Sequence, residues 1–300
     1  MSKPRLYYRQ KILLALSEVF DEPLEAIDFM KLLFLLCKEH GKGFYSFFPY
    51  RYGCFSSQAY QDWHFLQNNA FMCQGPQFQC SKDNLGIRRE IKKADYNALL
   101  SIREKYAGLR GQALIRQTYL EYPEYTLLSE IKDRVLTAQE IKTVEVVSGK
   151  YPVPVQNRVF TIGYESISID EYLHRLVLHG VQVLCDVRFT PRSMKYDFNA
   201  ARLAESLRQI GVEYRGIPSL GIPPELRKEL DSEQSYEKLF SLYESKILPK
   251  EKSQINEIGE MMQNGKRMAL ACFEKNPGHC HRSRLAALLS KQLHLETMNI

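Results

Sequence analysis

The sequence lacks the long apolar segments that a membrane-spanning protein needs. Crossing a bilayer by a helix takes about 20 consecutive apolar residues, and charged residues interrupt every candidate run, including the strongest one at Met30–Cys37. The N-terminal Met-Ser-Lys-Pro-Arg also lacks the apolar core and cleavage site of a secretory signal. We therefore expect a soluble, cytoplasmic protein with no membrane partner.

Several chemical signatures are missing as well. The seven cysteines are odd in number and show no paired short spacing, which argues against a disulfide framework. They stand at positions 37, 54, 73, 80, 185, 272 and 280. A glycine-rich dinucleotide fingerprint and a clear metal-binding motif are also lacking. The sequence therefore predicts no cofactor and no metal.

The chain has room for two domains and carries an excess of positive charge. Its 300 residues, 44% of them hydrophobic, suffice for one large domain or two of ordinary size. The formal net charge of +6 and the pI near 8.8 favour an anionic partner, with nucleic acid or a nucleotide as the leading candidate. Basic runs such as Arg88-Arg89 and Lys92-Lys93 fit that partner, although a charge run is more often a solvated face.

The pattern of the first half predicts a small helical domain with a β-wing. Apolar residues at helical spacing predict helices at Arg9–Val19, Glu25–Glu39, Gln58–Asn68, Asp95–Tyr106 and Gly111–Leu120. The aromatic segment Phe44–Tyr52 fits a short strand or hairpin arm. We assign residues 1–134 to this domain, which would bind nucleic acid or a partner. Residues 135–157, where periodicity fades, are predicted to be a linker.

The second half alternates strands with helices. Strands are predicted at Val159–Ile162, Val181–Val187, Val212–Arg215 and Met268–Phe273. Helices are predicted at Asp170–His179, Ala200–Ile210, Ser235–Leu248, Ser253–Asn264 and Arg282–His294, with Ser168 and Asn199 as candidate N-caps. This alternation predicts that residues 158–300 form a Rossmann-like parallel sheet covered by helices, which makes the fold class α/β.

Polar residues follow three of the predicted strands. They are Tyr164 after the first strand, Asp186, Arg188, Arg192 and Ser193 after the second, and Glu274 with His281 and Arg282 after the last. Ligands of parallel α/β sheets bind beyond the carboxyl ends of the strands, where helix N-termini point inward. We therefore expect these residues, together with Tyr214, to form one anion-attracting site.

The predicted roles follow from side-chain chemistry. Asp186 and Glu274 can activate water or stabilise a cationic transition state, and His281 can donate a proton. Arg188 and Arg282 suit phosphate recognition because a guanidinium offers paired donors. The competing structural interpretation is that Asp186 caps backbone amides or pairs with Arg188. Tyr164, Arg192, Ser193 and Tyr214 complete the predicted substrate-binding set.

The cysteines near the C-terminus allow two further hypotheses. Cys280, at a predicted helix start beside cationic groups, could be a thiolate nucleophile, or simply a packed thiol. Cys272, His279, Cys280 and His281 could bind zinc, but adjacent ligands depart from the usual separated pairs. Aromatic residues over Tyr45–Phe55 with Tyr60, Trp63 and His64 could stack on bases, although such spacing is more often domain core.

The second half resembles the bacterial domains of unknown function numbered 488. The matching segments are Thr161–Tyr164, Asp186–Arg188, Pro191–Ser193, Tyr214, Leu220-Gly221, Cys272–Glu274 and Cys280–Arg282. The resemblance spans about Val159 to Leu289 and implies a Rossmann-type fold without a settled activity. Gly-Tyr-Glu-Ser stands where many relatives have Gly-His-Ser. The first half is faintly similar to helical accessory domains of toxin–antitoxin and phage-related proteins, at Met30–Leu33 and Tyr52-Gly53.

These observations lead to one functional expectation and two alternatives. We expect a hydrolase that acts on a nucleotide or nucleic acid and cleaves an N-glycosidic bond, as a DNA base glycosylase does, with a role in phage defence against foreign or modified DNA. One alternative is a metal-dependent phosphodiesterase or nuclease in which Asp186 and Glu274 hold a divalent metal. The other is a non-enzymatic sensor of nucleotide or nucleic acid.

Overall fold

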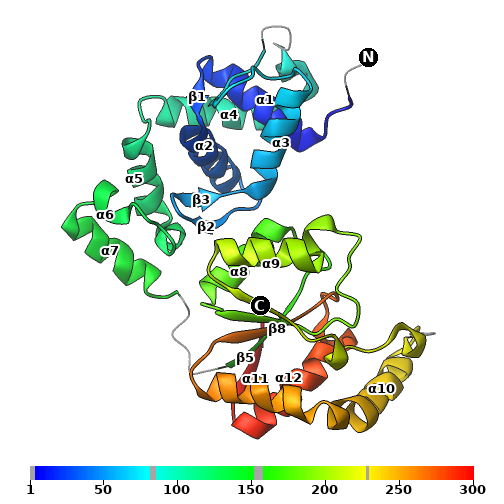
Figure 1. The fold of residues 1–300 in the computed structure, drawn as a ribbon. Coiled ribbons are helices and arrows are strands. Elements are labelled where there is room, and N and C mark those ends of the chain that lie inside the picture. The colour runs from blue at the N-terminus through cyan, green and yellow to red at the C-terminus, as the bar shows by residue number, and fades with distance from the viewer. Residues whose placement is uncertain (1–3, 82–85, 152–157, 228–229) are drawn as a thin grey trace. The chain divides into compact units, whose positions relative to one another are not determined.

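The computed structural model describes residues 4–81, 86–151, 158–227 and 230–300, and the chain divides into two compact units (Figure 1). The first unit is Met1–Lys150 and the second is Tyr151–Ile300. The first is mainly helical and the second contains a parallel sheet, so the predicted α/β fold class is confirmed.

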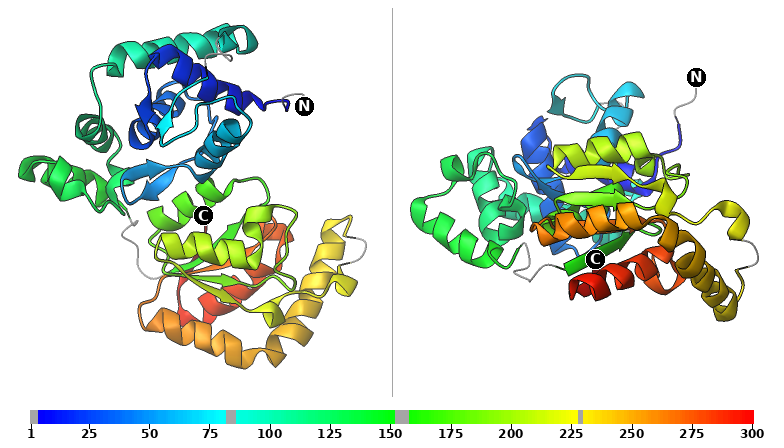
Figure 2. Two further views of the ribbon diagram at one scale, coloured as in Figure 1. Left: turned by 45° about the horizontal axis from the view of Figure 1, so that its top comes forward. Right: turned by 60° about the horizontal axis from the view of Figure 1, so that its bottom comes forward.

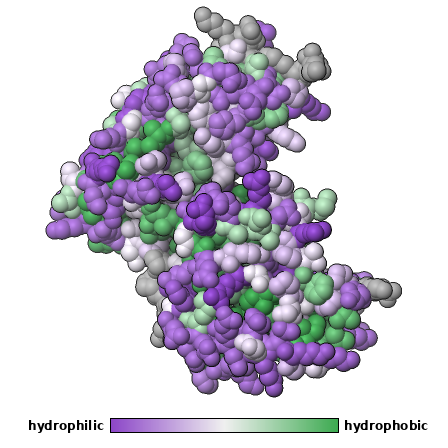
Figure 3. All heavy atoms as spheres, in the orientation of Figure 1, coloured by the Kyte–Doolittle hydropathy of each residue, from purple (hydrophilic) through white to green (hydrophobic). Residues whose placement is uncertain are grey.

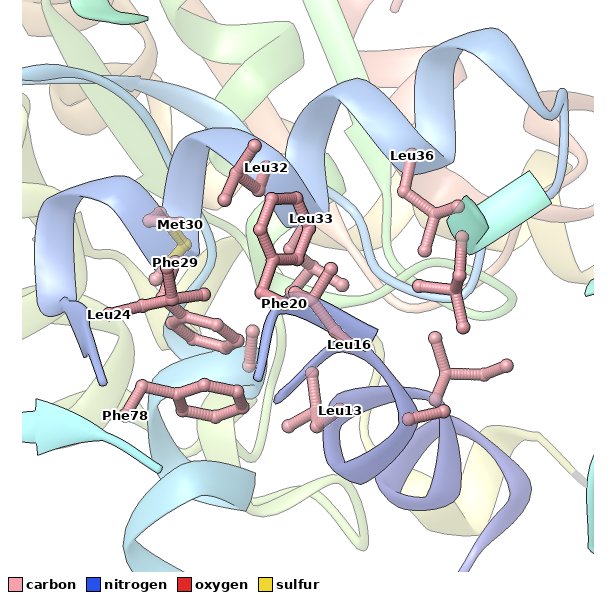
Figure 4. Close-up of a cluster of buried hydrophobic side chains, with 14 of the residues drawn as sticks. Leu13, Leu16, Phe20, Leu24, Phe29, Met30, Leu32, Leu33, Leu36 and Phe78 are labelled. Atoms are coloured by element: carbon pink, nitrogen blue, oxygen red, sulfur yellow. The ribbon is translucent and has the colours of Figure 1, made fainter. Parts of the chain in front are cut away.

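Helix α2 is the centre of the N-terminal unit. Its residues from Phe29 to Leu36 are buried, and they include Lys31. Phe29 stacks on Phe78 at a centroid distance of 3.8 Å, and leucines of α1 pack beside them (Figure 4). The helices of this unit are α1 Tyr8–Phe20, α2 Ala26–Glu39, α3 Ser57–Asn68, α4 Lys93–Tyr106, α5 Gln112–Glu121, α6 Lys132–Val135 and α7 Ala138–Ser148. The five helices predicted for this half correspond to α1 to α5.

The predicted β-wing is a hairpin of β2 (Phe48–Tyr50) and β3 (Gly53–Phe55). A second short pair joins β1 (Leu24–Glu25) to β4 (Gln77–Phe78). Gly53 has φ +94°, and a Cβ at this position would lie 2.5 Å from the ring of Tyr119. Both constraints require glycine where the hairpin meets α5.

Buried carboxylates join the helices of this unit. Asp95 on α4 is 1% exposed and accepts hydrogen bonds from Tyr8 (2.6 Å) at the start of α1, from His40 (2.7 Å) after α2, and from Lys42. Burial alone would raise the pKa of Asp95, but these three bonds outweigh burial and lower it to about 2. The carboxylate is therefore ionised and fixes three segments together.

Helix α7 lies inside the segment predicted to be a linker. Its N-terminus carries a capping box, in which Thr137 and Glu140 bond to each other's backbone amides. Only Val144 and Ser148 of this helix are buried, so its apolar periodicity is weak and the helix was missed. Residues 152–157 of the predicted linker lie outside the described residues.

The C-terminal unit is built on a five-stranded parallel sheet with the order β7-β6-β8-β5-β9. The strands are β5 Arg158–Gly163, β6 Val183–Asp186, β7 Glu213–Gly216, β8 Met268–Cys272 and β9 Glu296–Asn299. Every residue of β6 and β8 is buried, as expected for central strands covered on both faces. Strand β9 was not predicted, because its residues are mostly polar and exposed at the sheet edge.

Helices cover both faces of this sheet (Figures 1 and 2). Helices α8 (Ile169–Leu178) and α9 (Ala200–Gln209) lie on one face, and α11 (Lys252–Gln263) and α12 (His281–Leu293) lie on the other. Helix α10 (Glu233–Leu242) continues into a π-helical turn at Tyr243–Ile247. Ser168 caps α8 as predicted, since its side chain accepts from the Glu171 amide at 3.2 Å.

The surface is mixed in character. Figure 3 shows a face made largely of hydrophilic residues, with hydrophobic residues in scattered patches. Within the four described ranges, no helix is both long enough and apolar enough to cross a bilayer.

Candidate functional site

The strand order places a crevice between β6 and β8. The chain leaves β6 toward β7 at one edge of the sheet and leaves β8 toward β9 at the other edge. In parallel α/β sheets the connections diverge at such a point and leave a binding crevice beyond the carboxyl ends of the two strands. Asp186 ends β6, and Cys272 ends β8. The sequence alone could not provide this strand order.

Asp186 and Arg188 form a buried ion pair. Asp186 Oδ1 accepts from Arg188 Nε at 2.8 Å, and Oδ2 accepts from the adjacent guanidinium nitrogen at 2.5 Å. The side chains are 0% and 6% exposed. Burial opposes the charge of Arg188, but the bonds to Asp186 outweigh burial and raise the arginine pKa. The structural interpretation of Asp186 is therefore the one that the geometry favours.

The two predicted tyrosines belong to the same network. Tyr214 donates to Asp186 Oδ2 at 2.8 Å, and Tyr164 accepts from Arg188 at 2.7 Å while its ring stacks on Phe198. Arg188 also donates to the Phe198 carbonyl at 2.9 Å, so four of its five N–H donors are used by described residues. Asp186, Arg188, Tyr164 and Tyr214 thus brace the ends of β5, β6 and β7.

A pocket of about 470 Å³ opens above this network. Phe189, Met194 and Phe273 line it, and all three are exposed, at 41%, 104% and 41%. Exposed large apolar side chains gathered in a concave site indicate ligand binding. Sequence reasoning missed them. Their positions could have indicated a pocket, because Phe189 and Phe273 both lie in loops directly beyond the ends of buried strands.

Cationic side chains complete the pocket lining. Arg192 is exposed and has no ionic or hydrogen-bonding partner among the described residues. Lys195 instead donates to the carbonyls of Tyr164, Glu165 and Ile167 at 2.6 to 3.1 Å, which uses its three N–H donors. Arg192 therefore remains as the predicted residue best placed to meet an anion.

The loop that carries Arg192 is held in shape from within. Asn199 was predicted to cap α9, but its side chain binds the loop instead: Oδ1 accepts from the Ser193 amide at 3.0 Å, and Nδ2 donates to the Ser193 and Tyr196 carbonyls. The hydroxyl of Ser193 accepts from the Lys195 amide at 3.0 Å. Ser193 therefore shapes the pocket wall.

Glu274, the second predicted catalytic acid, contacts two residues that line the pocket. It pairs with Arg227 at 3.3 Å, and its other oxygen accepts from Cys272 Sγ at 3.2 Å. Arg227, Cys272 and Phe273 all line the pocket. Burial opposes ionisation of Glu274, but hydrogen bonds and Arg227 outweigh it and lower the pKa. Arg227, which the sequence analysis overlooked, thus holds a charged carboxylate at the pocket wall.

Cys272, Cys280 and His281 meet behind the pocket wall. Their Sγ, Sγ and Nδ1 atoms lie within 4.8 Å of one another, and each residue is 1% exposed. Burial raises the pKa of the Cys280 thiol well above its ordinary value, which favours the packed thiol over the predicted thiolate nucleophile. His279, proposed beside them as a zinc ligand, instead contacts exposed Glu233 at 3.0 Å. His281 is enclosed rather than open to a substrate.

Arg282 is buried away from the pocket lining. Its guanidinium donates to the Glu274 carbonyl at 2.5 Å and to Asn299 Oδ1 at 3.2 Å, and it is 0% exposed. It joins the loop after β8 to the edge strand β9. Gly163 permits this arrangement, because a Cβ there would lie 2.0 Å from the Glu274 carbonyl oxygen. The geometry favours a structural role for Arg282 over anion recognition.

The N-terminal unit offers a separate basic groove. Most of the aromatic segment proposed for base stacking is core: Tyr45, Phe47, Phe48 and Trp63 are at most 5% exposed. In contrast, the predicted basic run is on the surface, where Arg88, Arg89 and Lys93 line a groove of about 740 Å³. Arg88 stacks over the ring of Tyr96 at 4.9 Å.

The C-terminal unit is thus a parallel α/β domain with a ligand pocket at the switch point of its sheet. Residues 168–289 match the model of the family described as Domain of unknown function DUF488, so the predicted resemblance of this unit is confirmed. No curated protein and no solved structure matched the chain.

Proposed function

We propose that the C-terminal unit is a hydrolase that cleaves the N-glycosidic bond of a nucleotide or nucleic acid. The observation that carries this proposal is the pocket that exposed Phe189 and Phe273 line together with Arg192. An aromatic face stacks on a base with about 1 to 3 kcal/mol per base. A guanidinium without a partner suits the phosphate. Apolar and cationic groups in one pocket therefore match both parts of a nucleotide.

Glu274 supplies the chemistry in this proposal. Cleavage of a glycosidic bond passes through an oxocarbenium-like transition state, which a carboxylate stabilises while it directs the attacking water. Glu274 follows Phe273, and Arg227 holds it at the pocket wall. Asp186 is a positioning residue, because its side chain is 0% exposed and paired with Arg188, whereas the side chain of Glu274 is 23% exposed.

The N-terminal unit would hold the nucleic acid backbone. Its groove presents Arg88, Arg89 and Lys93 to solvent, and cations along a groove bind phosphates without sequence preference. DNA binding, a defensive role against foreign or modified DNA, and a cytoplasmic location all belong to this proposal.

The test is release of free base. The full chain is incubated with modified and with unmodified DNA, and mass spectrometry is used to look for released base and abasic sites. Glu274→Gln should abolish release, whereas Glu205→Gln should retain it, since Glu205 is an exposed helical residue paired with Arg208 on α9. If neither free base nor abasic sites are found with any substrate, the glycosidase proposal is wrong.

A metal-dependent phosphodiesterase is the second candidate. The bonds of Asp186 to Arg188 and Tyr214 disfavour the first form of this candidate, in which Asp186 and Glu274 hold a divalent metal. The cluster of Cys272, Cys280 and His281 is the observation that still favours a metal. Strand breaks that stop when a chelator is added would support this candidate over the glycosidase. Nucleotide binding without any turnover would instead support the non-enzymatic sensor.

A further inference from the structure

Three potential metal ligands meet at the carboxyl end of β8. Cys272 is the last residue of that strand, Cys280 is the N-cap of α12, and His281 is the first residue of the helix. All three are 1% exposed, and their donor atoms lie within 4.8 Å of one another. We propose that Cys272 Sγ, Cys280 Sγ and His281 Nδ1 bind a Zn²⁺ ion.

The spacing is close to that of a zinc site. Zn–S bonds of about 2.3 Å and Zn–N bonds of about 2.0 Å place tetrahedral ligand atoms roughly 3.5 to 3.8 Å apart. Cys272 Sγ and His281 Nδ1 are 3.9 Å apart. Binding therefore requires the side chains to move by less than about 1 Å. The donor atoms already lie within 4.8 Å of one another, so small side-chain movements can bring them to one ion.

The histidine is oriented as a ligand. Its Nε2 lies 2.9 Å from the Val187 carbonyl, which can only accept, so the proton is on Nε2 and the lone pair is on Nδ1. Metal-binding histidines commonly donate their second N–H to a carbonyl or carboxylate in this way. The ring of Tyr243 packs against the imidazole at 5.4 Å and limits its rotation. Nδ1 lies 3.9 Å from Cys272 Sγ and 3.3 Å from a guanidinium nitrogen of Arg227, so metal binding requires the Arg227 side chain to move aside.

The charges and ligand types favour zinc over harder cations. Two thiolates neutralise Zn²⁺, and the neighbouring Glu274 and Arg227 neutralise each other. The N-terminus of α12 adds a partial positive charge beside Cys280, which stabilises its thiolate. Thiolate and imidazole ligands select zinc against magnesium, calcium and manganese. Metal binding would thus account for two buried cysteines placed together with a histidine.

The fourth coordination position lies on the pocket side. Glu274 contacts Cys272 at 3.2 Å but is not in the group whose donor atoms all lie within 4.8 Å. Cys272 also lines the pocket. Zinc sites with three protein ligands keep a water in the fourth position. That water would sit beside Glu274, where the proposed hydrolase needs its nucleophile.

Metal content of the full chain tests the site without any assay of activity. The protein is purified without chelator, incubated with Zn²⁺, dialysed and analysed by plasma mass spectrometry. We expect about one Zn²⁺ per chain, and less than about a tenth of that in the double variant Cys272→Ala/Cys280→Ala. Cys185→Ala is the matched control, since Cys185 is equally buried in the adjacent strand β6 and lies outside the cluster.

Two results would overturn the proposal. One is wild-type protein that holds no zinc after this treatment, and the other is a double variant that retains as much zinc as wild type. If the double variant does not fold, cobalt substitution of wild type decides the question. Bound Co²⁺ should show thiolate-to-metal charge-transfer absorption, and bound Co²⁺ without that absorption contradicts thiolate ligation. Either failure leaves the glycosidase proposal standing, because base release is measured separately.

Discussion

Asp186→Asn should strongly destabilise the C-terminal unit while changing few atoms. The substitution keeps the shape of the side chain but removes the negative charge that faces Arg188. Both side chains are at most 6% exposed, so water cannot replace the lost partner. The guanidinium would remain charged, because arginine does not deprotonate in proteins, and it would keep only its neutral partners, the Tyr164 hydroxyl and the Phe198 carbonyl.

The magnitude follows from the burial of the pair. Removing one member of a buried ion pair costs about 3 to 5 kcal/mol, because the other charge stays buried and uncompensated. Exposed pairs contribute at most about 1 kcal/mol. Glu205→Gln is the matched control, since the Glu205–Arg208 pair has side chains that are 49% and 75% exposed. We expect a loss of about 0.5 kcal/mol or less for the control.

The assay is urea unfolding at pH 7, followed by probes that resolve the C-terminal transition. A double-mutant cycle with Arg188→Met separates the pair from other effects. The double variant should be no less stable than either single variant, which gives a coupling energy of at least about 2 kcal/mol. If Asp186→Asn costs less than about 1 kcal/mol, or if the two losses simply add, the ion pair does not brace the sheet as described.

Three further predictions concern other parts of the chain. Asp95→Asn should lower the free energy of unfolding near pH 7 by about 2 kcal/mol, since the native pKa of about 2 lies below the unfolded value. Because the native pKa of Asp95 is depressed, its contribution to stability is present above about pH 4 and is lost as the pH falls toward 2. If the stability of the Asp95→Asn variant depends on pH in the same way as that of wild type, this prediction is wrong. Gly53→Ala should cost more than about 2 kcal/mol in thermal or urea unfolding, whereas Gly108→Ala, with open space around its Cβ, should cost little. Burial raises the pKa of Cys185 to about 12, so an alkylating reagent at pH 8 should label half-buried Cys73 long before Cys185, and equal labelling rates would refute this.

Much of the fold could be predicted because its elements carry strong local patterns. The continuous apolar runs of β6 and β8 and the amphipathic α1 and α2 specify their own structures. Helix α7 was missed because it buries only Val144 and Ser148, although the Thr137–Glu140 capping box marked its start. Strand β9 was missed because a polar edge strand is defined by its partner β5 and not by its own residues.

The candidate site was only partly predictable for a related reason. The sequence places Asp186, Arg188 and Glu274 at strand ends, but it does not show which of their atoms are already engaged. Arg188 and Asp186 satisfy each other, whereas Arg227 comes from a loop with no motif to mark it. Cys272 lies close to Cys280 and His281 because the loop after β8 returns to the end of that strand. The spacing of these residues in the sequence does not reveal the path of the loop.

The most direct test of the central claim is an experimental structure of the full chain with a bound deoxynucleoside monophosphate. We expect the base to lie against Phe273 or Phe189, with the phosphate within hydrogen-bonding distance of Arg192 or Arg227. A nucleotide bound elsewhere, with the pocket at the ends of β6 and β8 left empty, would contradict the assignment of this pocket as the functional site.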